Sequence, residues 1–86
     1  MYVVELSFTD APQRLAARPA HRECLRELYS DGVVRLAGPY PDDSGAMLIF
    51  DVNDQAALDE LLAADPYYTT AGVTVVRKQA WTPIIS

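Results

Sequence analysis

The order of its hydrophobic periodicities constrains the fold of this 86-residue chain more than any other feature. Apolar and polar residues alternate in several short segments, which is the pattern of half-buried strands. Between them lie segments in which apolar residues recur every three or four positions, the pattern of amphipathic helices. The predicted order is strand, helix, strand, strand, helix and strand, with strands at 2–8, 33–38, 46–52 and 73–81. This order is typical of the split βαβ, or ferredoxin-like, α+β fold, an antiparallel sheet with two helices on one face.

Capping residues and a proline suggest the boundaries of the two helices. Thr9 and Asp10 are good N-cap residues for a first helical piece that runs through Ala17. Pro19 lacks a backbone N–H and restrains the residue before it, so we expect the helix to stop and restart there. The restarted helix extends to about Ser30. The remaining boundary residues are Asp31 and Gly32, which end this helix, and Asn53 or Asp54 with Ala63, which bound the second helix.

Composition limits the classes of function. The chain has 7 basic and 12 acidic side chains and a net charge of −5, whereas nucleic-acid binders normally carry a basic stripe. Its basic residues are scattered along the sequence, so we do not expect DNA or RNA as a partner. No apolar run approaches the roughly 20 residues that a membrane span needs, and residues 1–8 do not resemble a signal peptide. We therefore expect one cytoplasmic domain over residues 1–86, with no membrane partner.

The predicted sheet has a second face that is too apolar for contact with water. In an antiparallel sheet with one solvated face, the residues that point away from the helices are polar. Here those positions are apolar, and an exposed apolar patch of this kind usually marks an interface. We therefore predict a homodimer joined sheet to sheet. The residues assigned to this face are Val3, Val34, Leu36, Met47, Ile49 and Val76.

His21 is the only histidine of the chain and the first candidate for chemistry. It shares a predicted helical face with Leu25, Leu28 and Tyr29, and this face should pack on the sheet. The ordinary pKa of an imidazole, about 6.5, suits a proton carrier near neutral pH. We place His21 in the first turn of the restarted helix, where the helix dipole disfavours the imidazolium and favours a neutral base. The structural alternative is a boundary histidine with a satisfied hydrogen bond.

Asp65 is the natural partner of His21. It follows the second predicted helix, whose C-terminal end repels a carboxylate. We therefore expect another contact to compensate for this unfavourable position. Aspartate before proline is also a good N-cap for a short turn through Tyr67 and Tyr68. Both roles can hold together, because one carboxylate oxygen can cap the turn while the other meets His21. Whether that contact forms depends on how the two helices pack.

Other residues allow both a functional and a structural interpretation. Gly38 and Pro39 end a predicted strand, where glycine lets a ligand approach closely, but a strand that simply enters a turn looks the same. Arg18 and Arg22 flank the histidine and suit an anionic substrate, yet a solvated helix face is the simpler interpretation. Cys24 is expected to be a half-buried apolar filler rather than a catalytic thiol. No metal-ligand spacing or phosphate loop is present, so we expect neither a metal nor a cofactor.

An ordered set of motifs runs through the chain: R-P-A-H-R-E-C-L-R-E-L, D-G-V-V-R-L-A-G-P, D-S-G-A-M-L-I-F and L-L-A-A-D-P-Y-Y, with a final strand that ends near Trp81. Together they resemble the YCII-related (YciI-like) domain over nearly the whole chain. This resemblance implies a ferredoxin-like fold that dimerises as a dimeric α/β barrel. It also implies an active site built from a His-Asp pair, which falls on His21 and Asp65. The substrate-binding candidates, from the G-P and D-P-Y motifs of the family, are Gly38, Pro39, Pro66 and Tyr67.

Two hypotheses of different classes follow. In the first, the chain is a small-molecule enzyme in which His21 is the general acid/base and Asp65 orients it. Lyase-type elimination on small, ring-bearing substrates is one chemistry that the resemblance implies. In the second, the chain is a non-catalytic ligand-binding or assembly module that forms a homodimer. A weaker third idea, haem binding with His21 as axial ligand, comes from the wider group of dimeric barrels.

Overall fold

The computed structural model describes the whole chain, residues 1–86. Strands and helices follow one another in the predicted order, and a short 3-10 helix separates the second helix from the last strand. Each strand boundary lies within two residues of its predicted position. The elements are β1 (Tyr2–Phe8), α1 (Pro12–Ser30), β2 (Val34–Pro39), β3 (Gly45–Phe50), α2 (Gln55–Ala64), η1 (Pro66–Thr69) and β4 (Val73–Ala80).

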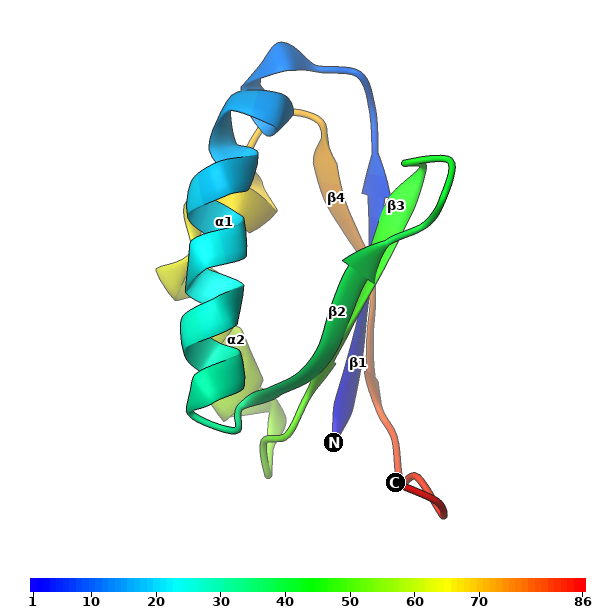
Figure 1. Cartoon of the computed structure of the whole chain (residues 1–86). Helices are drawn as coiled ribbons and strands as arrows, with labels where there is room; N and C mark the ends of the chain where they lie inside the picture. Colours follow the sequence, from blue (N-terminus) through cyan, green and yellow to red (C-terminus); the bar gives the residue numbers. More distant parts are fainter.

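The four strands form one antiparallel sheet in the order β2-β3-β1-β4. Both helices lie on the same face of this sheet (Figure 1). The α+β class and the antiparallel sheet with two helices are confirmed, and the topology is compatible with a ferredoxin-like fold. The order makes β2 and β4 the edge strands, and α1 connects β1 to β2.

Helix α1 is continuous over Pro12–Ser30, so the predicted restart at Pro19 is wrong. Proline inside a helix removes one hydrogen bond and crowds the carbonyl four residues earlier, at a cost of about 3 kcal/mol. Arg14 and His21 lie on either side of it and are both buried, and this packing keeps the two parts in one helix. The start of the helix also differs from the prediction. Its N-cap is Ala11, which makes no side-chain cap, and a proline follows in the first turn.

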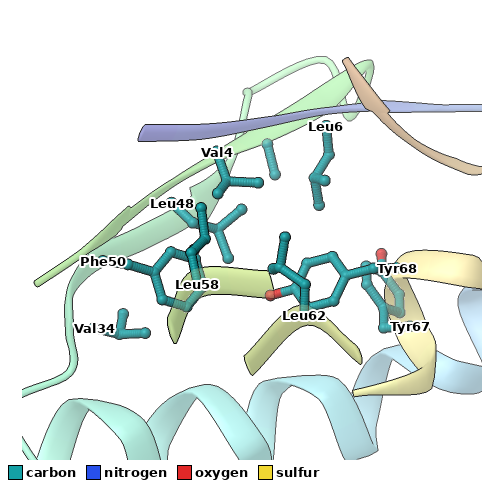
Figure 2. Close-up of a cluster of buried hydrophobic side chains, with 10 residues drawn as sticks. Val4, Leu6, Val34, Leu48, Phe50, Leu58, Leu62, Tyr67 and Tyr68 are labelled. Atoms are coloured by element: carbon teal, nitrogen blue, oxygen red, sulfur yellow. The ribbon is translucent and has the colours of Figure 1, made fainter. Parts of the chain in front are cut away.

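The hydrophobic core lies between the sheet and α2 (Figure 2). Helix α2 begins where the Asp54 carboxylate accepts a hydrogen bond from the backbone N–H of Ala57 at 2.8 Å. Leu58 and Leu62 are the buried residues of the helix, and its apolar face packs against the strands. The buried cluster comprises Val4, Leu6, Val34, Ala46, Leu48, Phe50, Leu58, Leu62, Tyr67 and Tyr68.

The face of the sheet that points away from the helices differs in part from the prediction. Leu36, Met47 and Ile49 lie on it, and the first two are 72% and 42% exposed. Val34 does not lie on it, because a bulge separates it from Leu36 and places it on the helix-facing side, where it is buried. A bulge inserts one extra residue into a strand, so it reverses the alternation on which the prediction depended. Val76 is likewise the extra residue of a bulge in β4.

Candidate active site

His21 and Asp65 are in contact, although 44 residues separate them in the chain. His21 comes from the middle of α1, and Asp65 is the residue between α2 and η1. The imidazole Nδ1 and the carboxylate Oδ2 are 2.7 Å apart. Both residues are buried, at 7% exposed each. The packing of α1 against η1 therefore creates the pair that the sequence left open.

The second oxygen of Asp65 caps η1. Oδ1 accepts a hydrogen bond from the backbone N–H of Tyr67 at 3.0 Å, while Oδ2 faces His21. Pro66 follows in the first turn, where its missing N–H leaves no donor unsatisfied. The two roles expected of Asp65 thus occur together: the cap orients the carboxylate, and the carboxylate orients the imidazole.

Two tyrosines of η1 hold the imidazole from two further directions. The Tyr67 ring stacks on His21, with ring centres 4.0 Å apart and planes 8° from parallel. The Tyr68 ring meets it edge-on, with centres 5.3 Å apart. Together with the bond to Asp65, these contacts restrict the rotation of the ring. The remaining ring nitrogen, Nε2, therefore points in one defined direction.

The surroundings of His21 favour its neutral form. Burial lowers the pKa of His21 below its ordinary 6.5, Asp65 offsets part of this effect through its hydrogen bond and charge, and the charge of Arg22 lowers the pKa further. A neutral ring that donates Nδ1–H to Asp65 has Nε2 free to accept a proton. The predicted contribution of a helix N-terminus is wrong, because His21 lies in mid-helix and the dipole acts only within the terminal turns.

A cavity of about 530 Å³ opens beside His21, between α1 and the β2–β3 edge of the sheet. Its volume suits a small organic molecule. Asp65 and Pro66 do not line it, since Asp65 contacts the imidazole from another side and Pro66 is exposed on η1. Three of the predicted substrate-binding residues line the cavity together with His21: Gly38, Pro39 and Tyr67.

Arg14 also lines this cavity, is only 2% exposed, and was not among the predicted site residues. Its Nε donates to the backbone carbonyl of Thr9 at 3.0 Å, and its Nη2 donates to the Asp43 carboxylate at 2.8 Å. The guanidinium lies 4.4 Å from the centre of the Phe8 ring, within the range of a cation–π contact. Its Nη1 is buried without a hydrogen-bond partner, which is rare for a buried donor.

Arg14 begins a row of arginines along α1. Arg18, Arg22 and Arg26 follow at four-residue intervals, and all four line the cavity together with Arg35 of β2. Side chains four residues apart are neighbours on one side of a helix. The basic residues are therefore not scattered in the fold, because five of the seven gather around one cavity. The four-residue spacing was the sequence signal from which this could have been predicted.

A comparison with protein families identifies the chain over nearly its whole length. The family model of the YCII-related domain matches residues 1–82. The chain belongs to the YCII-related domain family. This result confirms the resemblance seen in the order of the motifs. No significant match to this YCII-related domain is found among the curated proteins.

Three further features of this YCII-related domain limit what it can do. Cys24 is partly buried and does not line the cavity. Burial, together with the charges of Asp65 and Glu27, raises the pKa of its thiol, so the less nucleophilic protonated form is favoured. Groups of three or more His, Cys, Asp and Glu side chains that could hold a metal ion do not occur. None of its helices combines the length and the apolarity that a membrane crossing requires.

Proposed function

We propose that this YCII-related domain is a small-molecule enzyme that uses His21 as general acid/base and Asp65 as the residue that positions it. The observation that carries the proposal is the orientation of the imidazole, whose Nδ1 is held by Asp65 at 2.7 Å while His21 lines the cavity. A general base needs a fixed position within reach of its proton and a pKa that leaves it unprotonated. The lowered pKa of His21 meets the second condition.

The chemistry that best suits one positioned base is removal of a proton from carbon, as in a lyase-type elimination. Nε2 of His21 takes the proton, and the electron pair of the C–H bond forms the new double bond. The leaving group departs with the electron pair of its own bond. Asp65 stabilises the imidazolium that forms, since its carboxylate is 2.7 Å from Nδ1. His21 then returns the proton to the leaving group.

The proposal is tested with 5-nitrobenzisoxazole, a ring that opens when one carbon-bound proton is removed. The C–H electron pair completes a nitrile while the N–O bond breaks, and the product is a coloured phenolate, so the reaction requires only a base. We expect the protein to exceed free imidazole at equal concentration and His21→Gln to lower the rate roughly 10²–10⁴-fold. The rate should rise with pH as His21 loses its proton, with a midpoint below 6.5.

A matched control moves the histidine instead of removing it. His21→Gln combined with Gln55→His keeps one imidazole, at an exposed position of α2 that lies outside the cavity. This double variant should be as inactive as His21→Gln alone, and activity that survives in it would contradict the proposal. Circular dichroism checks that each variant keeps its fold.

The same assay distinguishes the enzyme from the second hypothesis, a non-catalytic binding module. If the chain is only a binding module, the wild-type protein opens the 5-nitrobenzisoxazole ring no faster than free imidazole does. Replacement of His21 or Asp65 then lowers the melting temperature clearly. A catalytic pair predicts little loss of stability, or a gain, because active sites often sacrifice stability.

We also propose that a second copy of the chain covers the free face of the sheet. The support comes from Leu36, 72% exposed on this face, and from Trp81, Ile84 and Ile85 of the tail after β4, which are 46%, 96% and 88% exposed. Apolar surface of this extent favours an interface. Light scattering during gel filtration at micromolar concentration should give twice the mass of one chain, and Leu36→Glu should give the single chain. A wild-type monomer would contradict the proposal.

A further inference from the structure

Two arginines next to His21 have no carboxylate partner, although the chain is acidic. Arg18 and Arg22 both line the cavity and form no salt bridge, in a chain with 12 acidic side chains. Unpaired arginines in an acidic protein indicate a local positive field that can attract an anion. The other five basic residues each have a carboxylate within 3.9 Å, and they are Arg14, Arg26, Arg35, Arg77 and Lys78.

Arg14 adds an unsatisfied donor to the same cavity. Its Nη1 is buried without a partner, while Thr9 and Asp43 occupy its Nε and Nη2. A buried donor without a partner is destabilising, so its presence calls for a functional explanation. Asp43 itself has a φ of 57°, a left-handed conformation that non-glycine residues seldom adopt. Aspartate is among the residues that tolerate this conformation in turns, and the turn places the carboxylate that holds Arg14 beside the cavity.

We propose that Arg14, Arg18 and Arg22 bind the carboxylate group of a small organic substrate, which places its reacting carbon at His21. The planar guanidinium fork matches the geometry of a carboxylate. Arginines near the reacting carbon would also stabilise the negative charge that develops when the proton leaves. The apolar part of the substrate would lie on the floor of the cavity, formed by Ala37, Pro39, Ala46 and Leu48.

This inference rests on the proposed function of His21 and adds the class of substrate, so it is tested by binding rather than by turnover. Benzoate and benzamide have nearly the same size and differ in charge. In calorimetric titrations at low salt, benzoate should bind about tenfold or more tightly than benzamide. The difference should shrink as salt is added. Arg18→Gln and Arg22→Gln should each remove most of the difference in affinity between benzoate and benzamide.

Arg77→Gln is the matched control, because it removes the same charge outside the cavity. Arg77, on the edge strand β4, pairs with Glu5 of β1 at 3.9 Å and does not line the cavity. This variant should bind benzoate within about twofold of the wild type. An equal loss in Arg77→Gln and Arg18→Gln would overturn the inference, since net charge alone would then explain binding. Equal affinities for benzoate and benzamide, or no benzoate binding at millimolar concentration, would also overturn it.

The two proposals can fail separately. His21→Gln should lose base catalysis but keep the preference for benzoate, because it leaves the three arginines unchanged. A preference for benzoate without base catalysis by His21 refutes the acid/base proposal and supports the anion site. Base catalysis by His21, combined with unchanged benzoate binding in Arg18→Gln and Arg22→Gln, refutes the carboxylate site alone.

Discussion

The space between the helices and the sheet is filled in one half of the molecule and open in the other. Next to α2, Val4 and Leu58 are both 0% exposed, and side chains fill the layer (Figure 2). Between α1 and β2, the helix-facing Ala37 and Pro39 remain exposed. A cavity of about 530 Å³ takes the place of the core there.

The half that stabilises the fold is therefore not the half that holds the candidate site. The packed core lies beside α2, and the cavity lies beside α1. Close packing of apolar side chains stabilises the fold, whereas a ligand site needs concave space and a few directed polar groups. His21 and Asp65 lie where the two halves meet, since one belongs to α1 and the other follows α2. Tyr67 joins the halves, because it belongs to the buried cluster and also lines the cavity.

The largest expected effect comes from the filled half. Leu58→Ala should lower the free energy of unfolding by about 2–5 kcal/mol, because it leaves a void in closely packed core. Leu25→Ala, at a partly buried position that lines the cavity, should cost less than half as much, since one side of this leucine is already open. Urea unfolding of both variants at pH 7 measures the comparison. Equal costs would show that the two halves do not differ in packing.

A smaller effect should appear in the dependence of stability on pH. The folded-state pKa of His21 lies below 6.5, so the unfolded chain binds this proton more readily. The contribution of His21 to stability is therefore present in full above pH 6.5 and is lost as the pH falls through the lower, folded-state pKa. Its slope is at most about 1.4 kcal/mol per pH unit.

Urea unfolding of the wild type and of His21→Gln, between about pH 5 and 8, isolates this contribution because the chain has no other histidine. The stability of the wild type relative to the variant should decrease toward acid pH. A difference that stays constant over this range would mean that burial does not perturb the imidazole.

The smallest expected effect is a shift in the titration of His21 itself. Asp65→Asn keeps an oxygen that can accept from the Tyr67 N–H but removes the charge beside the imidazole. The pKa of His21 should fall further, since the hydrogen bond and the charge of Asp65 both raise it in the wild type. NMR titration of the single imidazole measures the shift directly.

Asp59→Asn provides the control for this titration. Asp59 is an exposed carboxylate of α2 that pairs with Lys78 at 2.9 Å, so its loss should leave the pKa of His21 unchanged. A pKa of His21 that does not respond to Asp65→Asn would mean that the two residues do not communicate. The binding-module hypothesis would then replace the acid/base proposal.

The elements of the fold could be predicted because their signals are local. Alternation over residues 2–8 and the leucine spacing around Leu58 depend only on neighbouring positions. The capping role of Asp65 was predictable for the same reason, since aspartate before proline caps a turn in almost any context. The contact of Asp65 with His21 was a hypothesis that local signals could not decide.

The errors occurred where tertiary packing overrides a local rule. Pro19 should end a helix, but buried residues on both sides keep α1 continuous. Val34 should share a side with Leu36, but the bulge between them reverses its direction. A buried arginine is rare, so Arg14 was not considered, although its four-residue spacing from Arg18 placed both on one side of the helix.

The sequence by itself determined the class of the fold, the order of its elements, its family and the two residues of the His-Asp pair. The fold class and the order of the elements follow from periodicity and capping, whose physical causes act over a few residues. The family and the His-Asp pair follow from the resemblance that the ordered motifs carry. The tertiary structure alone decided that Nδ1 of His21 meets Asp65 at 2.7 Å and that a row of arginines surrounds an open cavity. These features arise from the packing of α1 against η1 and from its separation from the sheet, which depend on all the packing contacts of the domain together.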